Sequence, residues 1–413
     1  MAKIKAFKGL RPVRNKVHLV ASRPYDVLNT NEAKHEAEGN PDSFLHVVKP
    51  EIDFPSGQDP YAPEIYQRGR ENFERFLQDG VFFQDERESL YIYRLTMDGN
   101  SQSGIVAAAA VDDYFCDVIK KHELTRPDKE EDRKKHVRVS MMNAEPVFFA
   151  YPAMDTLDKI VDEIVAKDAE YDFVAGDGVR HELWAVNDER VPDIISEFEK
   201  LPATYVADGH HRTAAAALVG KDLRNENPDY SGDEAFNYFL AVHFPHNQLN
   251  IIDYNRVVKD LNGLSKEEFL ERLEDGFEVS EIGPQEYKPT KLHEFGMYLE
   301  GVWYKLSALE GTYNNNDPIG VLDVTILSRQ ILEPILDIVN LRTDKRIDFV
   351  GGIRGLEELE KRVDSSEMKV AFALYPVSMQ QLIDIADSGE IMPPKTTWFE
   401  PKLRSGLVIH SLK

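Results

Sequence analysis

The spacing of apolar residues predicts a chain of the α/β class, in which helices and strands are mixed (α+β). Apolar residues recur at helical spacing over residues 64–79, whereas residues 89–97 and 104–111 are short apolar runs typical of strands. The turn at residues 98–100 joins these two runs and predicts a β-hairpin. Further strands and helices are expected to alternate: strands over residues 146–150, 181–186 and 204–207, and helices over 155–169 and 191–201.

Other stretches give weaker patterns. Residues 1–60 are rich in turn-forming residues, and the short apolar runs at 17–21 and 44–48 are expected to be strands. The charged stretch at residues 128–138 is expected to be a solvated helix face or an exposed loop. From about Leu261 the chain changes to acidic helical stretches, so we expect a domain boundary there.

Composition limits the class of protein. Of 413 residues, 42% are hydrophobic and 30% are charged, as in ordinary globular proteins. No apolar run reaches the roughly 20 residues that span a bilayer, and the N-terminal MAKIKAFKGL lacks the apolar region of a secretory signal, so we expect a cytoplasmic protein without membrane contact. With 49 basic and 73 acidic residues the net charge is -24, which argues against nucleic acid as a partner but not against a mononucleotide.

The single cysteine excludes two classes of site. Cys116 cannot form an intramolecular disulfide, and the chain has no CxxC motif for zinc. A lone cysteine is most often a small buried hydrophobic residue, which is the expectation for Cys116.

The sharpest local feature is the sequence TYVADGHHRTAAAALVG at residues 204–220. A β-prone run leads to the turn-forming pair Asp208-Gly209, and the alanines at 214–217 favour a helix. His210 to Thr213 would then lie at a helix N-terminus, where unpaired backbone N–H groups and the positive end of the helix dipole favour a phosphate. The alternative is that Asp208 merely caps the helix. No GxxxxGK[ST] run is present, so a P-loop is not supported.

A second candidate is the sequence KHELTRP at residues 121–127. A carboxylate beside a histidine, here Glu123 and His122, can take a proton from an attacking hydroxyl; in phosphoryl transfer that residue mostly positions the nucleophile. Taken alone, such a pair is usually exposed and without a role, and His181-Glu182 repeats it inside an expected strand.

Several runs carry a resemblance to known proteins. YVADGHHRTAAA resembles the phosphate-binding motif of the ParB/sulfiredoxin-like superfamily, particularly of its free-serine kinases. Over nearly its whole length the chain is similar to a conserved, largely uncharacterised bacterial and archaeal family that carries this motif. The runs that support this similarity are residues 9–14, 23–29, 40–53, 121–127, 208–212 and 392–407.

The resemblance implies a ParB/sulfiredoxin-like nucleotide-binding core with N-terminal and C-terminal additions. The expected regions are an N-terminal α/β region at 1–115, the nucleotide-binding region at 116–262, and a C-terminal α/β region at 263–413 whose tail returns to the site. The residues implied to surround nucleotide phosphates are Asp208, Gly209, His210, His211, Arg212 and Thr213. Glu123, with His122 beside it, takes the catalytic role.

Further residues are implied in binding. The C-terminal Lys395, Thr396 and Thr397 match the family pattern and suit an anion or substrate. Relatives tend to have Thr-His-Arg where this chain has Tyr254-Asn255-Arg256, so only Arg256 is retained as a substrate contact. Asp208 is also expected close to Mg²⁺, which proteins often bind through one or two carboxylates together with phosphates.

These observations predict a small-molecule kinase that uses ATP or ADP with Mg²⁺ and a hydroxyl acceptor, possibly free L-serine. The alternative is a nucleotide-binding switch or regulatory protein of the ParB type without kinase activity. Redox repair of the sulfiredoxin type would require a cysteine in the motif, where this chain has histidine, and Cys116 lies far away in sequence.

Overall fold

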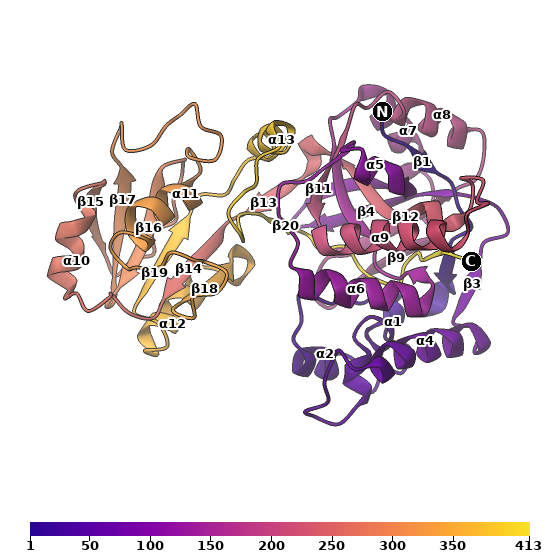
Figure 1. Cartoon of the computed structure of the whole chain (residues 1–413), viewed down its shortest axis with the longest axis horizontal. Helices are drawn as coiled ribbons and strands as arrows, with labels where there is room; N and C mark the ends of the chain where they lie inside the picture. Colours follow the sequence, from indigo (N-terminus) through magenta and orange to yellow (C-terminus); the bar gives the residue numbers. More distant parts are fainter. The chain divides into compact units, whose positions relative to one another are not determined.

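One nine-stranded mixed sheet organises residues 1–249 (Figure 1). The computed structural model describes residues 1–413. The strand order is β6 (Ile119–Lys120), β11 (Thr204–Asp208), β8 (Val147–Tyr151), β12 (Tyr238–Pro245), β5 (Asn100–Ala110), β4 (Leu90–Met97), β10 (Arg180–Val186) and β9 (Tyr171–Val174), with β1 (Ile4–Lys5) paired to β5. The pairs β6–β11 and β8–β12 are parallel, and the other pairs are antiparallel. The mixed α/β class and the expected β4–β5 hairpin are therefore confirmed.

The same part of the chain, residues 1–249, contains nine α-helices: α1 (Val17–Val20), α2 (Thr30–Glu36), α3 (Leu45–Val48), α4 (Pro63–Gln78), α5 (Val111–Phe115), α6 (Pro127–Ser140), α7 (Asp155–Val165), α8 (Arg190–Phe198) and α9 (His210–Glu226). The expected helices are confirmed as α4, α7 and α8. The expectation of strands at 17–21 and 44–48 is wrong, because those runs form α1 and α3. Each run has five residues, four apolar and one histidine, and such a short run fits a buried helical turn as well as a strand, so its periodicity could not decide.

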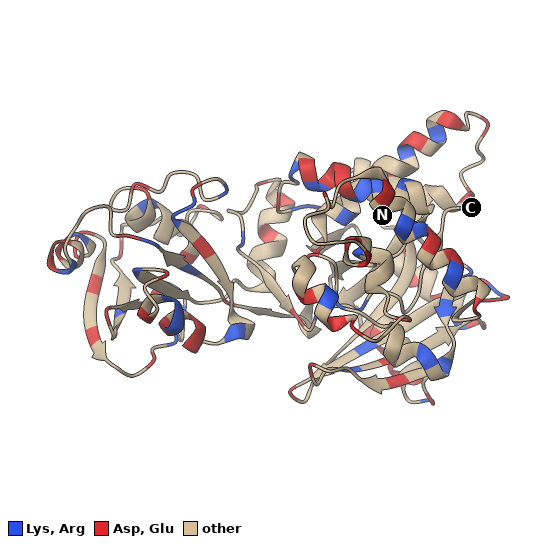
Figure 2. Cartoon of the chain, turned by 90° about the horizontal axis from the view of Figure 1, so that it is seen from below, with Lys and Arg blue, Asp and Glu red and all other residues tan.

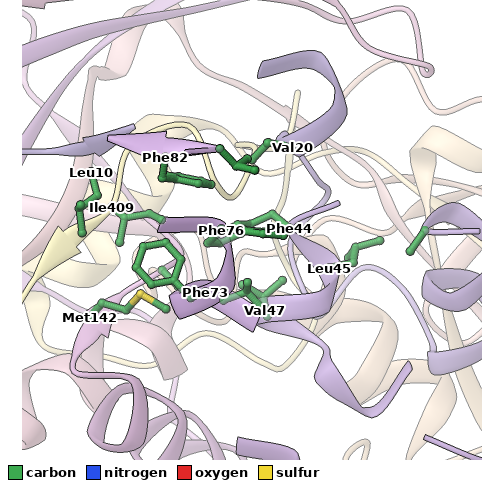
Figure 3. Close-up of a cluster of buried hydrophobic side chains, with 14 of the residues drawn as sticks. Leu10, Val20, Phe44, Leu45, Val47, Phe73, Phe76, Phe82, Met142 and Ile409 are labelled. Carbon is green, nitrogen blue, oxygen red and sulfur yellow. The ribbon is translucent and has the colours of Figure 1, made fainter. Parts of the chain in front are cut away.

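A phenylalanine-rich core joins the N-terminal helices to the end of the chain (Figure 3). Phe76 of α4 stacks on Phe82 of β3 (Phe82–Gln84), with ring centroids 6.0 Å apart. Ile409 packs in the same cluster, next to β21 (His410–Ser411), which pairs with β7 (Met142–Asn143). β3 in turn pairs with β2 (Leu10–Pro12). The C-terminal segment is thus built into the core of residues 1–249.

Helix α6 is less solvated than its charged sequence suggests. The helix is present, but Asp132, Arg133 and His136 are buried, so the expectation of a wholly solvated face is wrong. Arg133 Nε donates to Asp132 at 3.0 Å, and His136 Nε2 bonds the Val47 carbonyl oxygen at 2.9 Å. Tyr66 of α4 also donates to Asp132 at 2.8 Å, so these buried polar groups have partners both within α6 and on neighbouring elements.

Residues 250–400 form a second sheet, which is antiparallel throughout. Its order is β15 (Phe277–Gly283), β17 (Val302–Ala308), β16 (Glu294–Leu299), β19 (Val370–Leu374), β14 (Tyr254–Val258) and β18 (Ile347–Gly351). A two-stranded pair, β13 (Asn250–Ile252) with β20 (Trp398–Glu400), lies at the two ends of this segment of the chain. The helices of this segment are α10 (Lys266–Leu273), α11 (Asp323–Leu327), α12 (Glu357–Asp364) and α13 (Met379–Ser388), and Ser328–Leu332 is a π-helical turn.

The contacts divide the chain into a first unit, Met1–Leu249 with Pro401–Lys413, and a second unit, Asn250–Glu400. These bounds differ from the three expected regions because strands from residues 1–115 and from residues 116–249 pair within one sheet. Basic and acidic residues are interspersed along the ribbon (Figure 2). No helix has the length and apolar character that crossing a membrane requires.

Candidate functional site

The sequence ADGHHR forms a strand, a one-residue turn and a helix in the first unit. β11 ends at Asp208, and Gly209 follows as the N-cap of α9 with φ 94°, a left-handed conformation that favours glycine. His210 to Thr213 make the first turn of α9, and alanines continue the helix. The prediction of strand, tight turn and helix is confirmed.

The two sequence motifs meet because of the sheet topology. β6 and β11 are parallel neighbours, with Tyr205 opposite Lys120, so the residues that follow these strands lie at one edge of the sheet. His122 follows β6 and His210 follows β11, and their rings lie 4.5 Å apart at 89°. In addition, the backbone N–H of Arg126 donates to His211 Nε2 at 3.0 Å. Glu123, next to His122, belongs to this same loop.

Asp208 binds two basic side chains and does not cap the helix. Its Oδ2 accepts from Arg212 Nη2 at 3.0 Å, and its Oδ1 lies 3.5 Å from Lys402 Nζ. Burial opposes ionisation of this carboxyl, but Lys402 and Arg212 together lower its pKa to about 2. The N-cap of α9 is Gly209, and the Asp208 carboxylate pairs with Arg212 and Lys402, so the alternative of Asp208 as a simple helix cap is wrong.

Arg212 points into the interior of the unit. Its guanidinium donates to the Pro146 carbonyl oxygen and to Asp208. Although burial opposes it, the nearby carboxylates of Asp26, Asp208 and Glu145 raise the pKa of Arg212. Arg212 and Glu145 also line an internal cavity of about 20 Å³, the size of a single water. These contacts hold the first turn of α9 against the rest of the unit.

Thr213 is also turned inward. It is fully buried, and its hydroxyl donates to the Gly209 carbonyl oxygen at 3.0 Å. Thr213 therefore presents no side-chain group at the helix N-terminus, where the ring of His210 lies.

His122 and His210 are buried imidazoles with unpartnered nitrogens. Their residues are 1% and 6% exposed, and both ring nitrogens of His122 and Nε2 of His210 have no hydrogen-bond partner. Burial lowers the pKa of His122 to about 4, and burial together with His122 lowers the pKa of His210 well below its usual value. Both rings are therefore neutral at pH 7, with one donor and one acceptor each. Because buried polar atoms usually have a partner, this corner of the unit has the character of a binding site.

The residues of this corner do not fit a protein-held Mg²⁺ site. No three His, Cys, Asp or Glu side chains are grouped so that they could hold a metal ion. Asp208, the expected ligand, is already paired with Arg212 and Lys402, whose positive charges compete with a cation for its oxygens. We therefore assign no step to a metal held by this chain.

The remaining predicted residues belong to the second unit. Arg256 of β14 is 1% exposed, and its guanidinium donates to the carbonyl oxygens of Tyr254, Lys395 (2.9 Å) and Pro394 (3.4 Å). Burial lowers the pKa of Arg256 to about 10. The structure thus brings Arg256 and Lys395 together through the main chain.

The hydroxyl groups near Lys395 are placed by the same turn. Lys395 has φ 59°, and the buried Thr396 donates to the Pro393 carbonyl oxygen at 2.6 Å. Thr397 follows immediately before β20. These bonds stabilise the turn itself.

Sequence reasoning missed Lys402 and Glu145, and it misjudged Cys116. Lys402 lies in the C-terminal run that carries the family resemblance, and this was the available signal. Glu145 has no local pattern that marks it as a partner of a distant arginine. Cys116, expected to be buried, is exposed.

Comparisons with known proteins give a family match and distant structural similarities. The family model described as "Protein of unknown function (DUF1015)" matches residues 4–325. No curated protein matches this chain.

Among solved structures, a conserved hypothetical protein from Pyrococcus furiosus is 16% identical with a TM-score of 0.35, covering 73% of this chain and 93% of that chain. A free serine kinase in complex with AMP is 15% identical with a TM-score of 0.35, covering 74% and 91%. SbnI with C-terminal truncation from Staphylococcus aureus is 12% identical with a TM-score of 0.37, covering 73% and 85%. Similarity at these scores carries no functional argument.

Proposed function

This chain belongs to the DUF1015 family, and from the residues of its first unit we propose that it is a small-molecule kinase. It transfers a phosphoryl group from ATP or ADP to a hydroxyl acceptor such as free L-serine. The observation that carries the proposal is the meeting of the His122-Glu123 loop with the first turn of α9. A helix N-terminus that binds phosphate and a carboxylate that orients the attacking hydroxyl are two of the parts that phosphoryl transfer to a hydroxyl uses.

Each part has a role. The backbone N–H groups of His210 to Arg212 bind a phosphate of the nucleotide. Glu123 positions the acceptor hydroxyl and takes its proton. The bond between the terminal phosphorus and the bridging oxygen breaks, a bond from phosphorus to the acceptor oxygen forms, and the nucleotide leaves one phosphate shorter.

Arg212 and Asp208 are positioning residues in this proposal. The two Nη groups of Arg212 bind Pro146 and Asp208, and this pairing fixes Gly209 and the turn that presents the N–H groups. The resemblance of DGHHR to the phosphate-binding motif of the free-serine kinases supports the same assignment. The net charge of -24 supports a small acceptor in place of a nucleic acid.

Direct product analysis tests the proposal. Purified protein is incubated with ATP or ADP, with and without MgCl₂, and with L-serine or a pool of hydroxylated metabolites. Mass spectrometry should detect a phosphorylated acceptor together with the shortened nucleotide. Asp208→Asn, which keeps the shape but removes the ion pairs, should reduce the yield, whereas Asp229→Asn, on the exposed segment after α9, should not.

The outcomes separate the alternatives. Nucleotide binding without any product would favour a nucleotide-dependent switch over a kinase. Absence of nucleotide binding in the wild-type protein would contradict both.

A further inference from the structure

The His122–His210 pair is a ligand site with a property of its own. The rings come from two distant parts of the chain and meet edge to face at 4.5 Å. Three of their four nitrogens have no hydrogen-bond partner, although the residues are 1% and 6% exposed. Neither ring holds a proton readily at neutral pH, and the two titrations are coupled, because a positive charge on one ring opposes a positive charge on the other.

The pair stands at the positive end of α9. His210 is the first residue of this 17-residue helix, and the N-cap Gly209 offers no side chain to the first N–H groups. An anion bound by those N–H groups would lie beside the His210 ring, and His122 contacts that ring directly.

We propose that the His122–His210 pair takes up a proton when a nucleotide phosphate binds, so that nucleotide affinity is linked to pH. This inference rests on the proposed function, because it assumes that the ligand of this helix N-terminus is a nucleotide phosphate.

The surrounding charges explain why the proton arrives with the ligand. His210 faces Asp208 of β11, Lys121 after β6 and His211 of α9. The basic neighbours oppose a further positive charge, and Asp208 is already paired with Arg212 and Lys402. Without a bound phosphate, both rings of the pair therefore stay neutral.

A bound phosphate changes this balance. An opposite charge within about 4 to 6 Å raises a histidine pKa by roughly 1 to 3 units, which would bring His122 from about 4 to between about 5 and 7. Only one ring of the pair should gain the proton, because two adjacent imidazolium ions repel each other. A group whose pKa is higher in the complex strengthens binding as the pH falls through that pKa.

Calorimetric titration of the full chain with ADP measures this proton directly. The titration is repeated at about pH 6.5 in two buffers with different ionisation enthalpies, and the difference in apparent heat gives the number of protons taken up. We expect wild type to take up a fraction of one proton more than His122→Gln does. Between about pH 7.5 and pH 6 its affinity should rise roughly 5-fold more than that of the variant.

Two further variants control the comparison. Protonation of ADP itself is common to all proteins, so the difference between wild type and variant isolates the histidines. His35→Gln, which changes a histidine whose side chain is 89% exposed, should behave as wild type. His210→Gln should lose the proton uptake as His122→Gln does.

The inference and the proposed function fail in different ways. If ADP binds and wild type takes up no more protons than His122→Gln and His210→Gln, the inference is wrong and the proposed function is untouched. If wild type takes up the proton on ADP binding but no phosphorylated product forms, the inference is correct and the proposed kinase activity is wrong. Absence of ADP binding would overturn both.

Should both variants fail to fold, wild type alone decides the question. One imidazole Cε1–H resonance should then move toward its protonated position on ADP addition in NMR spectra. Unmoved resonances would overturn the inference.

Discussion

Arg256 in the second unit and the His122–His210 pair in the first unit are buried basic side chains with opposite hydrogen-bonding environments. The Arg256 guanidinium donates to the main-chain carbonyl oxygens of Tyr254, Pro394 and Lys395. In the first unit, His122 and His210 are buried to a similar degree, and three of their nitrogens have no partner. A buried donor that is bound by its own chain stabilises the fold, whereas one left without a partner is available to a ligand.

Within the first unit the same contrast separates Arg212 from its neighbours. Two residues after His210, both Nη groups of Arg212 donate to Pro146 and Asp208, as those of Arg256 do to carbonyl oxygens, and only its Nε has no partner. A basic residue in a phosphate motif is therefore not by itself a phosphate contact. The direction of its donors decides the role.

The largest effect on activity is expected from substitution of Glu123, the proposed base, because the contrast between the two units assigns the chemistry to the first unit. Glu123→Gln keeps the shape of the side chain but removes the group that accepts the proton, and should lower turnover by roughly 10² to 10⁴-fold. Nucleotide affinity should change little. Steady-state kinetics with the acceptor found by mass spectrometry would measure both.

Glu131→Gln, an exposed change on α6, is the matched control for Glu123→Gln. Full activity of the Glu123 variant would place the base elsewhere.

Arg256→Ala should affect stability without affecting nucleotide binding. The change leaves carbonyl oxygens of Tyr254 and Lys395 without a buried donor, and each such group costs about 1 to 3 kcal/mol, so unfolding should become easier by roughly 2 to 4 kcal/mol. Hydrogen exchange in peptides that carry β14 would report this loss locally. The exposed Arg354→Ala should stay within about 0.5 kcal/mol. If Arg256→Ala kept its stability but lost ADP affinity, Arg256 would be a ligand-binding residue and not a structural one.

Local parts of this arrangement were predictable from the sequence, whereas long-range parts were not. The turn pair Asp208-Gly209 and the following alanines determine the strand, turn and helix within a dozen residues. The approach of His122 to His210 depends on parallel pairing of β6, a strand of only two residues, with β11. No periodicity is detectable in two residues.

The inward direction of the Arg212 side chain also could not be predicted from the sequence. It depends on Glu145 and Asp26, which lie 67 and 186 positions earlier in the chain and carry no pattern that links them to the motif. The short apolar runs led to a wrong prediction of strands. Val17–Val20 and Leu45–Val48 are helical turns, and the core in which they pack is created only by the tertiary structure.

A buried acid in the second unit predicts how the stability of that unit depends on pH. Asp323 of α11 accepts the His293 N–H at 2.9 Å, its other oxygen has no partner, and burial raises its pKa to about 7. The folded state then holds a proton that the unfolded state has lost above about pH 4, so stability should fall as the pH rises from about 4 to 7. Asp323→Asn should remove this decline and, at about pH 8, have a free energy of unfolding higher than that of wild type by an amount on the order of 2 kcal/mol.

Thermal unfolding at about pH 4.5 and pH 8 measures the effect of Asp323→Asn. Asp348→Asn, an exposed change on β18, is the control. An unchanged pH dependence in the Asp323 variant would show that this carboxyl is ionised in the folded protein.

The smallest effect is expected at Lys402, the residue that sequence reasoning missed. Its ammonium lies 3.5 Å from Asp208 with 16% of the side chain exposed, so it neutralises a carboxylate beside the phosphate site without being fully desolvated. Lys402→Met should weaken ADP binding only about 3-fold at low salt, because partly solvated charge pairs contribute about 0.2 to 1 kcal/mol. Raising the ionic strength should shrink the difference, since salt screens exposed charges. Lys159→Met, on the exposed side of α7, should not change the affinity. A loss of more than about 100-fold for Lys402→Met would instead mean that this ammonium binds the phosphate directly, and the site would then extend from the helix N-terminus to the C-terminal segment.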